Sequence, residues 1–102
     1  MLKRDLKTSI SKLTDQEFLV FSTIYQLEQD NSFNGFIDYP LLSDKLKLTE
    51  SSIRDYILRI IKKGIPLNKK KVNNKKIVLS IPTSFKQIAT LSSILTFRTQ
   101  KH

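Results

Sequence analysis

The chain has 102 residues, of which 39% are hydrophobic and 26% charged, as is typical of one small soluble domain with a single core. It contains no cysteine and one histidine, His102, and no apolar run approaches the ~18 residues of a membrane span. Disulfides, thiolate metal sites and nucleophile–histidine pairs therefore have no candidates. We expect a protein without enzymatic activity, metal, cofactor or membrane contact, and, because no secretory signal is visible, an intracellular one, cytoplasmic or nucleoid-associated.

The net charge of +9 is distributed unevenly along the chain. Residues 1–12 contain four cations and one anion, residues 13–55 three cations and eight anions, and residues 56–102 eleven cations and no anion. This asymmetry predicts a basic surface, formed by the second half and facing a polyanion. The alternative is that the lysine content only reflects genome composition.

Residues 1–12 form a basic N-terminal segment in which Leu2, Leu6 and Ile10 recur every fourth position. The spacing allows a short helix, or an arm that lies along phosphates or against a partner subunit. Because chain termini are usually mobile, we favour a segment without a defined role.

A helix is predicted over Leu13–Asp30, where Thr14 and Glu17 have the spacing of a capping box and Leu13 and Phe18 that of a hydrophobic staple. We expect this helix to be a scaffold for the segments that follow. Its apolar residues are numerous enough to contact neighbours on more than one side: Phe18, Leu19, Val20, Phe21, Ile24, Tyr25 and Leu27.

A polar turn and a short strand at Phe36 and Ile37 are expected next, followed by a short helix capped by Asp38. Pro40 suits the first turn of this helix, where a missing amide hydrogen has no cost. Leu41, Leu42 and Leu46 would form its buried side.

A second, longer helix is predicted from the N-cap Thr49 to Gly64, which can adopt the left-handed conformation that closes a helix. Lys62 and Lys63 suit the negative end of the helix dipole. The apolar residues recur at helical spacing and predict one buried face: Ile53, Tyr56, Ile57, Ile60 and Ile61.

After Gly64 the pattern becomes extended, and Asn73-Asn74 predicts a two-residue hairpin turn between strands Leu67–Val72 and Lys75–Ile81. Lysines that only discourage aggregation of an edge strand would number one or two, whereas five lysines lie at this hairpin. The cluster therefore favours contact with phosphates. The cluster consists of Lys69, Lys70, Lys71, Lys75 and Lys76.

Pro82 ends the second strand, and Thr83 or Ser84 can cap a last helix that we expect to run to about Thr99. Its apolar stripe can pack back on the first long helix, or pair with its copy in a second subunit. We favour a homodimer built on the stripe, which comprises Phe85, Ile88, Leu91 and Leu95, with Ile94 or Phe97 beside it.

Over roughly Leu13–Ile81 the chain resembles the winged helix-turn-helix family. Ser43 and Ile53 have the family's ten-residue spacing of a small and a branched residue, and Leu46 and Leu48 occupy core positions between the helices. Lys47 stands where the family commonly has glycine, so a left-handed backbone there is expected to be strained.

The resemblance implies an α+β, mainly helical fold with a three-helix core, a β-hairpin wing with a short third strand, and an additional C-terminal helix. The corresponding segments are residues 1–12, the winged helix-turn-helix over residues 13–81 and the C-terminal helix over residues 82–102.

The resulting hypothesis is a sequence-preferring, double-stranded DNA-binding transcription regulator whose second helix enters the major groove. We expect Ser51, Ser52, Arg54, Asp55 and Leu58 to face base edges, with Arg54 contacting guanine. Phosphate contacts are expected from Thr49, Arg59, Lys62, Lys69, Lys70, Lys71, Asn73, Asn74, Lys75 and Lys76.

Two other classes stay open from the sequence. One is a winged-helix module that binds a protein or nucleic acid within a larger replication or recombination assembly. The other is a non-specific architectural binder of DNA or RNA, which would show the same lysines but no dependence on Ser51, Ser52 or Arg54.

Overall fold

The computed structural model describes residues 3–30, 32–33, 35–73 and 76–99. This part of the chain is α+β and mainly helical, with six helices and one two-stranded antiparallel sheet. None of its helices combines the length and the apolar character needed to cross a membrane. In chain order the elements are α1 (Lys3–Ser11), α2 (Asp15–Gln29), α3 (Tyr39–Leu46), α4 (Glu50–Lys62), β1 (Asn68–Val72), β2 (Lys76–Ser80), α5 (Thr83–Ile88) and α6 (Leu91–Thr99).

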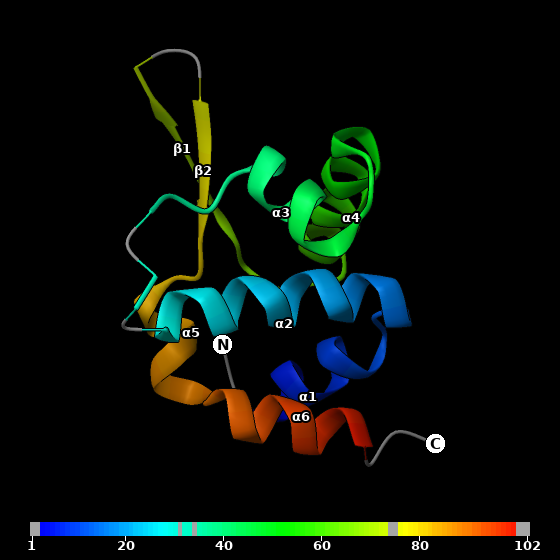
Figure 1. Cartoon of the computed structure of the whole chain (residues 1–102). Coiled ribbons are helices and arrows are strands. Elements are labelled where there is room, and N and C mark those ends of the chain that lie inside the picture. Colours follow the sequence, from blue (N-terminus) through cyan, green and yellow to red (C-terminus); the bar gives the residue numbers. More distant parts are fainter. Residues whose placement is uncertain (1–2, 31, 34, 74–75, 100–102) are drawn as a thin grey trace.

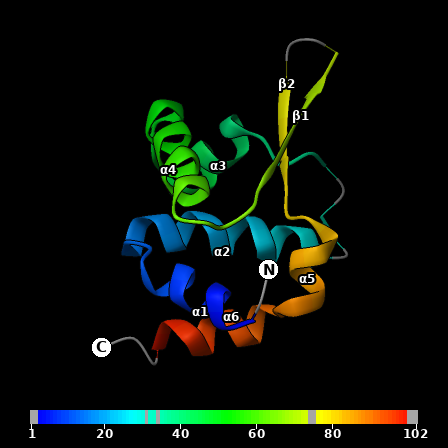
Figure 2. The same ribbon diagram turned by 180° about the vertical axis from the view of Figure 1, so that it is seen from behind.

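Helix α2 runs through the middle of the molecule and separates two groups of elements (Figure 1). Helices α3 and α4 and the β1–β2 hairpin lie on one side of it, whereas α1 and α6 lie on the other; the view from behind shows the same order (Figure 2). Contacts follow this order, since α2 packs on both α4 and α6. The expectation that α2 has neighbours on more than one side is therefore confirmed.

The predicted capping box at the start of α2 is present. The Thr14 hydroxyl accepts from the Glu17 amide at 3.2 Å, and Glu17 Oε1 accepts from the Thr14 amide at 3.0 Å. Further along α2, the rings of Phe21 and Tyr25 make edge-to-face contacts with Phe85, with centroids 5.5 and 6.4 Å apart. This aromatic cluster connects α2 to α5 in the core.

Helix α1 belongs to the core, which differs from our preference for a mobile terminus. Leu6 and Ile10 are completely buried, as is Leu13 after the helix, and α1 packs against α6. Leu2 lies outside the described residues. The four-residue spacing of these apolar residues thus has a packing cause, and α1 lies at the end of the molecule away from the hairpin (Figure 1).

The third strand expected at Phe36 and Ile37 shrinks to a single bridge. Asp38 pairs with Val78, and the Leu79 amide donates to the Ile37 carbonyl at 2.7 Å. The strand cannot extend further along the chain because Asp38 is the N-cap of α3, and the backbone turns into the helix at once.

The hairpin register also differs from the prediction by one residue. Val72 pairs with Lys76, not with Lys75, so the connection between the strands has three residues. Asn73, the first of these, has a φ of 55°, which confirms its left-handed conformation. Asn74, the second residue of the predicted turn, and Lys75, predicted to begin the second strand, lie outside the described residues.

The predicted C-terminal helix is interrupted, so the expectation of one continuous helix to Thr99 is wrong. Ala89 is extended, with φ −138°, and its carbonyl accepts a hydrogen bond from the buried Tyr25 hydroxyl at 2.6 Å. The Thr90 hydroxyl then accepts from the Ser93 amide at 3.1 Å, as the cap of a new helix does. The break lets α5 and α6 pack on different parts of the domain.

The stripe that we expected to form a dimer interface is largely used within the protomer. Phe85 is 2% exposed in the aromatic cluster, and Ile88 and Leu91 are half-buried against the core. Only Leu95, with 41% exposure, has a largely free side chain. Helix α6 packs on α1 and α2, which is the alternative that the sequence left open.

Gly64 closes α4 as expected, with φ +99° and with the Ile65 amide donating to the Ile60 carbonyl at 3.3 Å. A Cβ atom at this position would lie 2.9 Å from Ser9 Oγ of α1. We predict that Gly64→Ala lowers the free energy of unfolding by about 1–2 kcal/mol, measured by urea denaturation. Gly35→Ala is the matched control, because its Cβ would meet no atom closer than 3.5 Å. Equal stability of the two variants would contradict the assigned strain.

Candidate nucleic-acid interface

Helix α4 is fixed to the domain by one narrow stripe. Ile53, Ile57 and Ile60 are completely buried, and α4 packs on α2 and α3. The predicted stripe was wider, and for Ile61 the prediction is wrong, because its side chain is 36% exposed; Tyr56 is only half-buried. The opposite side of α4 is consequently free for contact with another molecule.

The residues predicted to meet base edges do share the free side of α4. Ser51, Arg54, Asp55 and Leu58 are exposed, and Leu58 reaches 47% although it is apolar. Ser52 is half-buried. Of the predicted phosphate contacts on this helix, Arg59 and Lys62 are exposed as well.

Thr49 is the N-cap of α4, as predicted. Its hydroxyl accepts from the Ser52 amide at 3.0 Å and donates to the Ser52 hydroxyl at 2.9 Å. Both hydroxyls are therefore engaged within the first turn, and their contribution to an external contact is smaller than that of the other predicted residues.

The turn between α3 and α4 has the geometry that the spacing implied. Lys47 adopts the left-handed conformation, with φ 58° and ψ 42°, at the position where glycine is more common. The Ser43 hydroxyl donates to the Leu48 carbonyl across the turn. Leu46 and Leu48 are half-buried against the core, so the predicted positions between the helices are confirmed.

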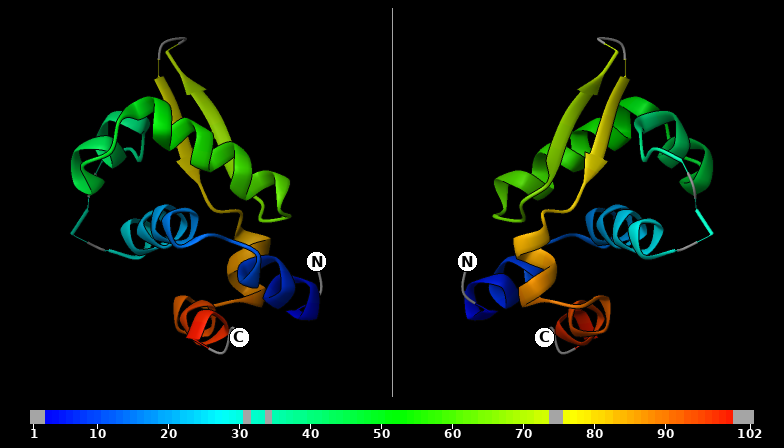
Figure 3. Two further views of the ribbon diagram at one scale, coloured as in Figure 1. Left: turned by 90° about the vertical axis from the view of Figure 1, so that its right-hand side faces the viewer. Right: turned by 90° about the vertical axis from the view of Figure 1, so that its left-hand side faces the viewer.

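The hairpin projects from the domain on the same side of α2 as helix α4 (Figure 3). On β1, Lys69, Lys70 and Lys71 are exposed. Lys76 on β2 differs, because its Nζ lies 3.2 Å from Asp38 Oδ2 and 5.6 Å from the centroid of the Phe36 ring. Lys76 therefore ties the turn end of β2 to the start of α3.

Ion pairs separate the basic residues of the second half into two groups. Three of them are neutralised by carboxylates of α2: Lys63 by Glu17 at 2.5 Å, Lys86 by Glu28 at 2.8 Å and Arg98 by Asp15 at 2.6 Å. A second group forms no ion pair with any described residue, and its members lie on α4 and β1: Arg54, Arg59, Lys62, Lys69, Lys70 and Lys71. From Arg54 onward, the unpaired positive charge of the described residues thus lies on α4 and the hairpin.

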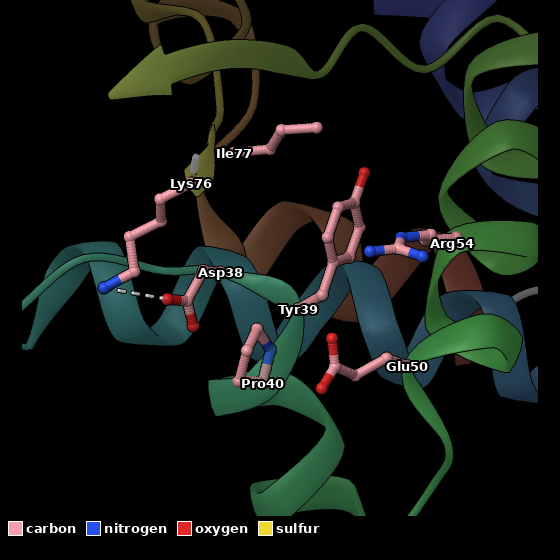
Figure 4. Close-up of a pocket in the computed structure, with 7 residues that line it drawn as sticks. All are labelled: Asp38, Tyr39, Pro40, Glu50, Arg54, Lys76 and Ile77. Atoms are coloured by element: carbon pink, nitrogen blue, oxygen red, sulfur yellow. Dashed lines mark ion pairs between the residues drawn. The ribbon is translucent and has the colours of Figure 1, made fainter. Parts of the chain in front are cut away.

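A pocket of about 240 Å³ lies where α3, α4 and β2 meet (Figure 4). The guanidinium carbon of Arg54 stands over the Tyr39 ring, 5.0 Å from its centroid. Tyr39 is 5% exposed, and burial raises the pKa of its hydroxyl more than the neighbouring charge of Arg54 lowers it. The wall of the pocket consists of Asp38, Tyr39, Pro40, Glu50, Arg54, Lys76 and Ile77.

Sequence reasoning missed Tyr39. It lies between a helix cap and a proline, outside every periodic pattern, and nothing in the sequence indicates that Arg54, 15 positions later, stacks on it.

Within the described residues, no group of three or more histidine, cysteine, aspartate or glutamate side chains could hold a metal ion. Comparison of the chain with protein-family models, curated proteins and solved structures gave no match.

Proposed function

We propose that this chain is a winged helix-turn-helix protein that binds double-stranded DNA with a preference for sequence, most simply as a transcription regulator. One observation supports this proposal above the others. Among the described cations from Arg54 onward, those that no carboxylate neutralises lie on α4 and β1, while those facing α2 are paired. A surface of this kind is stabilised by a polyanion.

The free side of α4 would occupy the major groove, which is about 12 Å wide and admits a helix. Arg54 offers two parallel donors that suit the O6 and N7 acceptors of guanine, and the exposed apolar Leu58 suits a thymine methyl group. Ser51 and Asp55 would complete the contacts to base edges. Arg59, Lys62 and the lysines of β1 would bind phosphates and supply affinity without specificity.

A protein-binding module is the second candidate, because two apolar side chains on the free side of α4 are exposed: Leu58 by 47% and Ile61 by 36%. Three consecutive exposed lysines on β1 favour a nucleic acid over a protein partner, since each would need a separate carboxylate in a protein interface.

The proposal is tested by titrating the protein into a labelled random DNA duplex and following fluorescence anisotropy over a series of salt concentrations. Single-stranded DNA and an RNA duplex are the controls. We expect a preference for the DNA duplex and a slope of log K against log salt of about −3.6 or steeper, corresponding to about four phosphate contacts. Absence of binding at low salt would reject the proposal and direct the search to an acidic protein partner.

Arg54→Ala is expected to reduce the preference for a selected duplex over a random one by about 1–3 kcal/mol, because the variant lacks the two donors that distinguish guanine. Lys62→Ala, on the same helix, is the control and should weaken binding to both duplexes equally. The selected duplex comes from rounds of enrichment from a random library. If Arg54→Ala weakens both duplexes equally too, Arg54 does not contact a base.

A further inference from the structure

Arg54 stands over a buried ring, Tyr39, whereas Arg59 lies farther from the half-buried ring of Tyr56. An exposed arginine side chain normally samples many rotamers, and binding has to remove this freedom. Here the guanidinium lies over the face of Tyr39 at 5.0 Å, which is within the range of a cation–π interaction. The stack keeps Arg54 in the wall of the pocket between α3, α4 and β2 (Figure 4).

Tyr39 is itself held in place from several directions. It is the first residue of α3, whose N-cap Asp38 accepts from the Leu41 amide at 2.9 Å, and Pro40 restricts the backbone on its other side. Asp38 also bonds to Lys76 of β2 at 3.2 Å. Because only 5% of Tyr39 is exposed, its ring is a rigid support for Arg54.

We propose that Tyr39 is a positioning residue of the DNA interface, whose ring holds the Arg54 guanidinium in one orientation and thereby sets the preference for guanine. This inference rests on the proposed function. It assigns specificity to a buried residue of α3 that makes no contact with DNA itself.

The chain offers a matched control in Tyr56, which lies under Arg59 with the guanidinium carbon 5.9 Å from its ring centroid. Sites are selected from a random duplex library with the wild type, and the wild type, Tyr39→Leu, Tyr39→Phe and Tyr56→Leu are then compared. We expect Tyr39→Leu to reduce the discrimination at the guanine position about threefold to tenfold, since a cation–π contact of this strength is lost. Tyr39→Phe keeps the ring and should match the wild type, as should Tyr56→Leu.

The double variant Arg54→Ala and Tyr39→Leu separates a structural role of Tyr39 from a positioning role. If Tyr39 acts only by positioning Arg54, the double variant should discriminate as well as Arg54→Ala alone. The salt slope of binding to random duplex should stay the same in every Tyr39 variant. Unchanged discrimination in a folded Tyr39→Leu variant would overturn the inference, as would a further loss in the Arg54→Ala background.

A third measurement follows the Arg54 side chain of the free wild-type protein by nuclear magnetic resonance. This measurement needs neither bound DNA nor a folded variant. The Nε–H group of Arg54 should show restricted motion and a ring-current shift, whereas that of an exposed, unstacked arginine shows neither. A freely moving Arg54 side chain would overturn the inference even if duplex DNA binds. A restricted side chain in a protein that binds no DNA would leave the positioning intact and reject the proposed function.

Discussion

Replacement of Lys69, Lys70 and Lys71 by glutamine is expected to lower the affinity for every DNA duplex by about 500-fold at 0.1 M salt. Each lysine that neutralises a phosphate releases condensed counterions, so three contacts contribute about 2.7 units to the slope of log K against log salt. At 0.1 M, one decade below the 1 M reference, this slope corresponds to a factor of about 10 to the power 2.7. Anisotropy titrations over a salt series measure both quantities.

The side chains of β1 are suitable for this test because all three lysines are exposed and their replacement leaves the core untouched. Lys69 and Lys71 are two positions apart and lie on one face of the ribbon, whereas Lys70 lies on the other. The sequence of the duplex should not matter, since phosphates are the same in every duplex.

The control is the double variant Lys7→Gln and Lys12→Gln, which removes exposed charge from the α1 end of the molecule (Figure 1). If the effect of the hairpin lysines came only from the overall net charge, the control would flatten the salt slope in proportion to the charge removed. We expect its slope to equal that of the wild type. A proportional change would contradict contact between the hairpin and phosphates.

Features of the fold that depend on neighbours in the sequence were predictable. The capping box of α2, the N-caps Asp38 and Thr49, and the left-handed Gly64 all follow from interactions between residues at most five positions apart. The strands of the hairpin belong to the same class, although the register slipped by one residue because the turn has three residues and not two.

Features that depend on distant residues were not predictable. At the break in the C-terminal helix, the Thr90 hydroxyl that caps α6 is a local signal, but the hydrogen bond from Tyr25 to Ala89, 64 positions away, cannot be inferred from neighbouring residues. Burial of α1 likewise requires α6 as its partner, so the sequence of α1 alone could not distinguish a mobile arm from a core helix.

The same distinction applies to the candidate site. Helical spacing placed Arg54, Asp55 and Leu58 on one free face of α4, and the structure agrees. Which cations are neutralised was invisible in the sequence, because the partners of Lys63 and Lys86 lie 46 and 58 positions earlier in the chain. The positive surface is therefore smaller than the charge of residues 56–102 suggests.

Lys63→Met is expected to lower the free energy of unfolding at neutral pH by about 2–3 kcal/mol, because it leaves the carboxylate of Glu17 buried without its cation. The Glu17 side chain is 2% exposed, and Lys63 Nζ lies 2.5 Å from its Oε1. Methionine keeps the apolar stem of the lysine, so the loss reports mainly on the charge. Urea denaturation of wild type and variant measures the difference.

The pH dependence identifies the ion pair as the cause. Burial by itself would raise the pKa of Glu17, but the hydrogen bonds from Lys63 and the Thr14 amide, with the charges of Lys63 and Arg59, outweigh it and hold the pKa below its ordinary value of 4.5. A carboxyl group with a depressed pKa contributes stability that is fully present above pH 4.5 and is lost as the pH falls through its folded-state value. The difference between wild type and Lys63→Met should therefore be largest near pH 7 and should shrink below pH 4.5.

Lys62→Met is the matched control on the neighbouring residue, which is exposed and forms no ion pair with a described residue. It should change the stability by less than about 0.5 kcal/mol at either pH. If the effect of Lys63→Met did not vary with pH, it would have to come from packing and not from the pair with Glu17. The pair joins the start of α2 to the end of α4, so its loss would also loosen the attachment of the helix that we propose to enter the DNA groove.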